Sequence, residues 1–147
     1  MRQHQENLRI GRYSQQNQTY HITFTTKNRL PIYADFTKAR VLISVLKQSD
    51  QLSQTHTLAF AVMPDHIHWL FQLVGTQSLS NIIKSVKSKA TVQLGSPLWQ
   101  AGYYDHAIRK DEDIQAIARY IIANPIRAGL VKKVGDYPHW DAVWLLR

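Results

Sequence analysis

The sequence predicts an α+β fold, a ferredoxin-like sandwich in which helices pack on an antiparallel sheet. Residues 20–26 alternate apolar and polar side chains, which is typical of a strand with one buried face. Two further apolar stretches, 57–63 and 66–74, are separated only by Pro64-Asp65 and so predict a hairpin. Amphipathic helical patterns follow the first strand and the hairpin. The order strand, helix, hairpin, helix, strand, helix favours helices layered on one sheet.

Capping residues and apolar periodicity define the first two helices. Asp35 predicts the cap of a helix that reaches about Gln48. Its apolar face consists of Phe36, Ala39, Ile43 and Leu46. Ser80 predicts the cap of a second helix, whose core-facing residues are Ile83, Val86, Ala90 and Leu94. Lys84 and Lys87 fall on the opposite face of this helix, which therefore carries a basic stripe.

The last part of the chain predicts a loop, a short strand and a third helix. The loop and the strand fall within 97–108. The acidic run Asp111-Glu112-Asp113 opens the helix, because acids complement the positive end of a helix dipole. We expect the helix to end at Asn124, because the residue before a proline disfavours the α conformation.

The composition predicts one domain and narrows the chemistry. A chain of 147 residues with 44% hydrophobic residues can bury one core, which we assign to residues 19–147, preceded by a basic arm over residues 1–18. The chain has no apolar stretch of about 18 residues and no apolar run near its start, so we expect a cytoplasmic, nucleoid-associated protein. The absence of cysteine excludes disulfides, thiolate metal sites and a cysteine nucleophile.

The charge balance predicts a polyanionic partner. Eighteen Lys and Arg residues against ten Asp and Glu residues give a net charge of +8. The chain also contains four Trp and seven Tyr residues. Unpaired bases stack on aromatic rings while cations follow the phosphates, so this composition favours single-stranded nucleic acid.

Two histidines share one face of the second hairpin strand. Side chains alternate along a strand, so His66 and His68 point to one side while Ile67, Trp69 and Phe71 point to the core. Two imidazoles placed in this way can converge on one ion. A bare His-x-His pair is equally consistent with two half-exposed surface histidines.

Tyr120 lies at the border of the apolar stripe on the third helix, and Asn124 lies one turn further along. A tyrosine hydroxyl with a pKa of about 10 is a poor nucleophile unless a cation or base favours its deprotonated form. The Asn124 amide oxygen is a candidate third ligand beside the tyrosine. By its position alone, Tyr120 is better explained as a helix-border aromatic that packs on the core with its hydroxyl in solvent.

The strings VMPDHIHWLFQL, LWQAGYYDHAIR, DEDIQAIARYIIANPIRAGLV and GDYPHWDAVW resemble the REP-associated tyrosine transposases. These enzymes are related to the single-tyrosine insertion-sequence transposases, within the His-hydrophobic-His endonucleases. The similarity runs from about Tyr20 to Trp144. The resemblance implies that His66 and His68 are the metal pair and that Tyr120 is the nucleophile. Asn124 falls where relatives place a polar third ligand.

The resemblance also implies the reaction and its substrate. The expected substrate is single-stranded DNA beside REP-type hairpins, which the tyrosine cuts through a covalent 5′-phosphotyrosine, with Mg²⁺ or Mn²⁺ as cofactor. We expect a monomer, although insertion-sequence relatives form dimers. Two alternatives remain open: a phosphodiesterase of the same shape that uses water as nucleophile, and a non-catalytic binder of hairpin DNA.

Further residues are candidates for contacts with DNA. The candidate phosphate contacts are Arg9, Arg12, Lys84, Lys87, Arg109 and Arg127. The candidate stacking or neighbouring residues are Trp99, Tyr103, Tyr104 and His106. For each cation taken singly, a solvated surface charge explains the residue better. For the aromatic residues, a place in the core is the better explanation.

Overall fold

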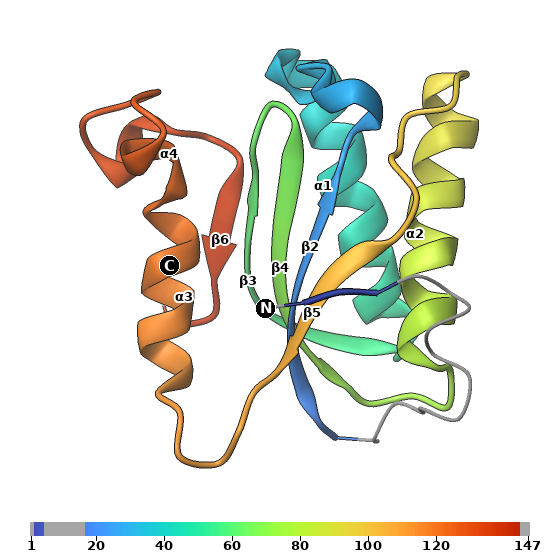
Figure 1. Cartoon of the computed structure of the whole chain (residues 1–147), viewed down its shortest axis with the longest axis vertical. Coiled ribbons are helices and arrows are strands. Elements are labelled where there is room, and N and C mark those ends of the chain that lie inside the picture. The colour runs from blue at the N-terminus through green and yellow to red at the C-terminus, as the bar shows by residue number, and fades with distance from the viewer. Residues whose placement is uncertain (1, 5–16, 145–147) are drawn as a thin grey trace.

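The computed structural model describes residues 2–4 and 17–144, which form one six-stranded sheet with α-helices on both faces (Figure 1). The strands are β1 (Arg2–His4), β2 (Thr19–Thr25), β3 (Thr55–Val62), β4 (His66–Leu73), β5 (Tyr103–Ala107) and β6 (Trp140–Ala142). The α-helices are α1 (Phe36–Gln51), α2 (Leu79–Leu94), α3 (Ile114–Ile122) and α4 (Asn124–Arg127). Short 3-10 turns span Lys27–Arg29, Ile32–Ala34 and Val134–Asp136.

The central part of the sheet confirms the predicted ferredoxin-like sandwich. The strands lie in the order β1-β5-β2-β4-β3-β6, and every neighbouring pair is antiparallel. The run β2-α1-β3-β4-α2-β5 is the βαββαβ pattern of this fold. Strands β3 and β4 form the predicted hairpin, with Val62 opposite Ile67 next to the turn.

The two faces of the sheet have separate apolar clusters because side chains alternate along each strand. One cluster joins Ile22, Ile67 and Trp69 to the buried residues of α1 and α2. The other joins Ala61 and Leu70 to α3. Figure 1 shows the consequence, with α1 and α2 on one side of the sheet and α3 on the other. The face that carries His66 and His68 is therefore the face on which α3 packs.

Local sequence explains where the helices begin. Asp35 accepts a hydrogen bond from the Lys38 amide, so the predicted cap of α1 is confirmed. Asp113, the last residue of the acidic run expected to open the third helix, caps α3 by accepting from the Ala116 amide. The predicted cap at Ser80 is wrong, because Ser78 caps α2 by accepting from the Asn81 amide.

Two further helix predictions need correction. Phe36 was expected on the buried face of α1, but it is 60% exposed because it is the first residue of the helix and lies beyond the edge of the core. The third helix ends at Ile122 rather than Asn124, and Asn124 begins the short α4, in which Pro125 occupies the first turn where no amide donor is needed.

The two outer strands were not predicted from the sequence. Strand β1 pairs with β5 through Arg2, Gln3 and His4, within the segment that we expected to be a basic arm. Strand β6 pairs with β3. Arg9 and Arg12 lie outside the described residues. Within residues 2–4 and 17–144, no helix has the length and apolarity that a membrane crossing requires.

Candidate active site

His66 and His68 are neighbours on the α3 face of β4. Their ring centroids are 5.0 Å apart and the rings meet almost at a right angle, with 81° between their planes. Strand β2 runs beside them, with Thr25 opposite His66 and Thr23 opposite His68. The alternation of the strand therefore brings the two predicted metal ligands together, as the His-x-His spacing predicts.

Asp65 holds the ring of His66. The Nδ1 atom of His66 lies 2.7 Å from Oδ1 of Asp65, and the other carboxylate oxygen accepts a hydrogen bond from Arg29 at 3.1 Å. Burial raises the pKa of Asp65, but the hydrogen bond and charge of His66 and the charge of Arg29 outweigh burial and lower it. The carboxylate is thus ionised and orients the imidazole through Nδ1, which leaves Nε2 as the nitrogen available to a ligand.

Two groups from β2 hold the ring of His68. Its Nδ1 atom lies 3.0 Å from Nε2 of His21 and 3.2 Å from Oγ1 of Thr23. Burial, and after it the charges of His21, His66 and Arg127, lowers the pKa of His68 to about 3. His68 is therefore neutral near pH 7, which is the form of imidazole that binds a metal ion.

His21 is buried beside His68, with 4% of its surface exposed. Burial, and after it the charge of His106, lowers the pKa of His21 to about 4. His106 lies opposite His21 on β5, and its Nε2 is 2.9 Å from both carboxylate oxygens of Glu112. His21 matches no sequence motif and was not among the predicted site residues. Finding it would have required the β2–β4 register, which no local pattern contains.

The two imidazoles of His66 and His68 could hold a divalent ion only if other groups supplied its remaining ligands. Both rings use Nδ1 for a neighbouring side chain, as metal-bound histidines usually do. Among the described residues, no cluster of three or more His, Cys, Asp or Glu side chains is placed to hold a metal ion. The remaining ligands must therefore be amide, water or substrate oxygens.

Tyr120 lies on α3, on the side of the sheet that carries the two histidines. The side chain is 55% exposed, so it is neither sealed in the core nor covered by the sheet. The Arg127 guanidinium lies 3.7 Å from the centroid of its ring, and Nη2 donates a hydrogen bond of 2.6 Å to the Tyr120 carbonyl. Arg127 thus contacts Tyr120, and its charge also acts on His68.

Asn124 is half-buried at the start of α4, one turn after Tyr120. Its Nδ2 donates to the Ile121 carbonyl at 3.1 Å. Its Oδ1 accepts no hydrogen bond from the part of the chain that the structure describes, so this oxygen is open to a further partner.

Several candidate DNA contacts also have structural roles. The Nζ atom of Lys87 donates to the carbonyls of Gln100 and Gly102, and thus fastens the segment after α2. Trp99 packs in stacked contact with Tyr33 and donates its indole N–H to the Lys87 carbonyl. Tyr103 is only 5% exposed, with its hydroxyl next to Ser80 Oγ. The Tyr103 ring thus belongs to the core, and the partly buried Trp99 ring packs against it.

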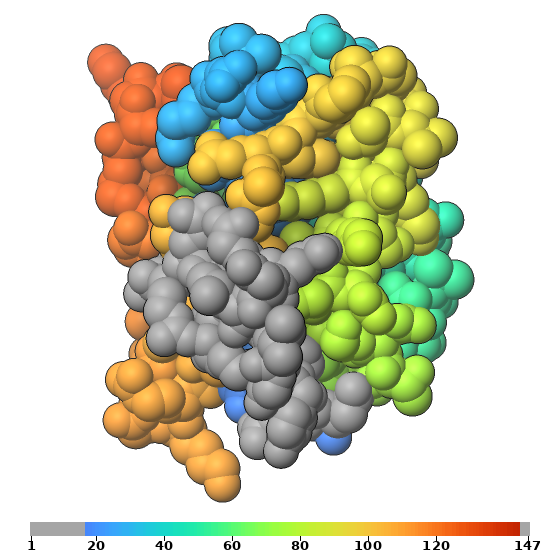
Figure 2. Space-filling view, turned by 45° about the vertical axis from the view of Figure 1, so that its right-hand side comes forward, coloured from blue at the N-terminus to red at the C-terminus, as the bar shows by residue number. Residues whose placement is uncertain are grey.

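The segment after α2 lies at the surface of the molecule, beside the 3-10 turn Lys27–Arg29 (Figure 2). Residues 96–102 lie against the turn at Lys27, where the Lys27 amide donates to the Leu98 carbonyl (Figure 2). Lys84 is exposed on α2. Lys84 thus lies on the exposed side of α2, whereas Lys87 lies partly under the segment after the helix.

The other candidates lie on or near β5. Tyr104 is 38% exposed and lies opposite Thr23 of β2, so its ring is accessible on the histidine face. His106 is engaged by Glu112. Arg109 is exposed in the loop before α3, where it forms an ion pair of 3.3 Å with Asp111. An exposed pair of this kind is weak and leaves the guanidinium available to a phosphate.

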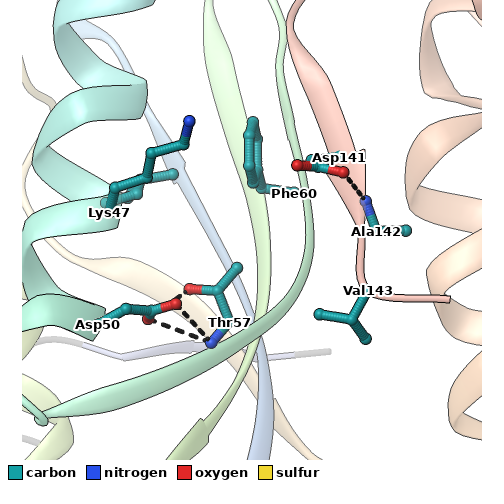
Figure 3. Close-up of a pocket in the computed structure, with 8 residues that line it drawn as sticks. Lys47, Asp50, Thr57, Phe60, Asp141, Ala142 and Val143 are labelled. Atoms are coloured by element: carbon teal, nitrogen blue, oxygen red, sulfur yellow. Dashed lines mark hydrogen bonds between the residues drawn. The ribbon is translucent and has the colours of Figure 1, made fainter. Parts of the chain in front are cut away.

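Two hollows open on the described surface. One, of about 420 Å³, has His66 and Asp65 in its wall, together with Arg29, Pro31, Met63, Pro64, Ala128 and Leu130. The other, of about 410 Å³, lies between α1, β3 and β6 and contains none of the predicted site residues (Figure 3). In this second hollow Thr57 donates to Asp50 through both its amide and its hydroxyl. Of these two hollows, the first therefore gives a ligand access to His66.

Comparison with known proteins defines the class. The family model described as "Transposase IS200 like" matches residues 14–124. This match covers most of the chain, including both histidines and Tyr120. The chain therefore belongs to the IS200-like transposase family.

Two curated relatives are similar to part of the chain. A REP-associated tyrosine transposase of Escherichia coli (strain K12) is 34% identical over 82 residues, which are 54% of this chain and 50% of that protein. A Haemophilus influenzae protein assigned to the same group is 32% identical over 112 residues, which are 65% of this chain and 64% of that protein. The chain spans between half and two thirds of the length of these relatives.

Solved structures agree with this grouping. A REP-associated tyrosine transposase bound to a REP hairpin has a TM-score of 0.77 and 27% identity, covering 88% of this chain and 79% of that one. A protein from Deinococcus radiodurans R1 described as a transposase has a TM-score of 0.54 and 21% identity over 72% of this chain and 88% of that one, which supports the fold alone. The resemblance found in the sequence is confirmed.

Proposed function

We propose that this chain is a metal-dependent endonuclease and strand transferase that acts on single-stranded DNA at REP-type hairpins. One observation carries the proposal: His66, His68 and the exposed Tyr120 all belong to the same side of the sheet. Membership of the transposase family and the hairpin bound to a structural relative support DNA as the substrate.

The reaction exchanges one phosphodiester for another. The Tyr120 hydroxyl oxygen attacks phosphorus and loses its proton to solvent, while the bond from phosphorus to the 3′ oxygen breaks and that oxygen takes up a proton. The products are a free 3′ hydroxyl and DNA joined to Tyr120 as a 5′-phosphotyrosine. Because the new bond resembles the broken one, another 3′ hydroxyl can reverse the step without an energy source.

The two imidazoles fit a divalent ion, which we take to be Mg²⁺ or Mn²⁺. His66 and His68 would hold the ion through Nε2, since the Nδ1 of each ring is already engaged. When bound, the ion polarises the scissile phosphate towards attack. Imidazole is a softer ligand than these ions select, so the Asn124 amide, water and phosphate oxygens would have to complete the coordination.

Arg127 links the nucleophile to the site. Its guanidinium covers one face of the Tyr120 ring and is fixed by the Tyr120 carbonyl. A cation in this position restrains the ring and stabilises negative charge as it develops near the phenol oxygen. Arg127 therefore has a role in positioning Tyr120 in addition to the phosphate contact that we expected from the sequence.

One experiment separates this proposal from its two alternatives. A labelled REP-type hairpin oligonucleotide with a single-stranded flank is incubated with the protein and Mn²⁺, and the products are separated on a denaturing gel. We expect a protein-linked DNA band that disappears in Tyr120→Phe. Cleavage without an adduct that survives this substitution would favour water as nucleophile, and binding without cleavage would favour a non-catalytic binder. Tyr104→Phe is the matched control, since this tyrosine is also exposed on the same face.

A further inference from the structure

Four histidines form a row across three strands on the α3 face of the sheet. His66 and His68 belong to β4, His21 to β2 and His106 to β5. The proposed reaction uses only the first two. His21 connects the pair to the rest of the row, because it contacts His68 on one side and lies opposite His106 on the other.

The sheet register sets the contact between His21 and His68. Thr23 lies directly opposite His68, and His21 lies two residues before Thr23, so the two histidines are diagonal neighbours. Diagonal neighbours on adjacent strands are within reach of ring-sized side chains. The Nε2 of His21 meets the Nδ1 of His68 at 3.0 Å, and the two ring centroids are 5.2 Å apart.

The two metal ligands are thus anchored through the same ring atom by different partners. A carboxylate, Asp65, engages Nδ1 of His66, whereas an imidazole, His21, engages Nδ1 of His68 at a shorter distance than the Thr23 hydroxyl does. A buried imidazole is costly unless its nitrogens find partners, and an apolar residue would fill this place at lower cost. A purely structural role therefore does not explain why the buried neighbour of His68 is a histidine.

We propose that His21 is a positioning residue that holds His68 in the tautomer whose Nε2 can bind the ion. The inference rests on the proposed function and deepens it. When the proton of the neutral His68 ring is on Nδ1, it is donated to the Nε2 lone pair of His21, and Nε2 of His68 carries a lone pair. The opposite tautomer would place a proton on the very nitrogen that must coordinate.

The first test needs no substitution and no metal. A long-range ¹H–¹⁵N correlation spectrum of the metal-free protein reports which nitrogen of each neutral histidine carries the proton. We expect His68 to carry it on Nδ1. A wild-type protein in which His68 carries its proton on Nε2 overturns the proposal, whatever its activity.

The second test uses substitutions that keep or remove the acceptor at the Nε2 position. Gln places an amide group near the position of Nε2, whereas Phe fills the same space without a hydrogen-bonding atom. We expect His21→Phe to weaken Mn²⁺ binding by about 10- to 100-fold in electron paramagnetic resonance titrations, and His21→Gln to remain within about threefold of wild type. His56→Phe, an exposed histidine on β3, serves as the control.

The Mn²⁺ titrations and the tautomer spectrum test the role of His21 independently of the cleavage assay. Equal Mn²⁺ affinity in wild type and a folded His21→Phe variant overturns the proposal, and so does equal weakening in the Phe and Gln variants. If His21→Phe does not fold, the wild-type tautomer and the His21→Gln titration decide. A wild-type protein that forms no DNA adduct but shows the expected tautomer and affinities would refute the strand-transfer function and leave the role of His21 standing.

Discussion

The two sides of the proposed site are held in opposite ways. His66 and His68 are fixed on the central strand β4, and His68 is only 9% exposed. Tyr120 is 55% exposed on the peripheral helix α3, and its ring meets one cation, Arg127. An ion site must be preorganised to bind well, whereas a nucleophile must reach a phosphate and then carry the DNA. The difference fits the proposed roles, with the proposed metal ligands fixed and the proposed nucleophile accessible.

The largest effect is expected on the fixed side. His66→Ala removes a ligand, so we expect the adduct to fall more than about 100-fold, since the loss of even an outer partner of a metal ligand costs about 10- to 100-fold. Hairpin affinity in gel shifts is expected to stay near wild type, because it depends mainly on phosphate contacts. An equal fall in affinity and cleavage would contradict this separation, and His56→Ala is the control.

A smaller effect is expected on the accessible side. Arg127→Met keeps the length of the side chain but removes the guanidinium, so we expect the rate of adduct formation to fall about 10-fold. Arg127→Lys keeps the charge without the planar stack, and is expected to recover only part of the rate. Single-turnover kinetics on a labelled hairpin measures both. Wild-type rates in both variants, together with a weaker salt dependence of binding, would show that Arg127 serves as a phosphate contact only.

The smallest effects distinguish two lysines of α2. Lys84→Ala is expected to weaken hairpin binding modestly and to reduce the slope of log affinity against log salt by about 1, with little change in stability. Lys87→Ala removes the donor to two carbonyls, so we expect a loss of about 1 to 2 kcal/mol in denaturant unfolding and an unchanged salt slope. If Lys87→Ala instead reduced the salt slope while Lys84→Ala lowered the free energy of unfolding, Lys87 would be the lysine that faces the DNA.

Local patterns were sufficient to predict the frame of the site. The turn at Pro64-Asp65 and the alternation after it predicted the hairpin and the shared face of His66 and His68. The caps at Asp35 and Asp113 were also predictable, because a cap depends on residues three positions apart.

Features that depend on contacts between residues far apart in the sequence could not be predicted. Trp99 and Tyr103 have the composition of a stacking surface, and only the packing of their segment against α2 and Tyr33 places them in the core or against it. His21 has no motif, since its partner His68 is distant in sequence and becomes a neighbour only through the register of β2 on β4. Strand β6 is three residues long, which is too short for an alternation pattern to predict.

The most direct test of the central claim is to identify the residue that carries the DNA. Trypsin cleaves after Arg119 and Arg127, and the peptide 120–127 contains Tyr120 as its sole tyrosine. After reaction with a hairpin oligonucleotide and nuclease trimming, mass spectrometry should find a nucleotide attached to this peptide through Tyr120. Attachment at another residue, or cleaved DNA with no attached peptide, would contradict the account.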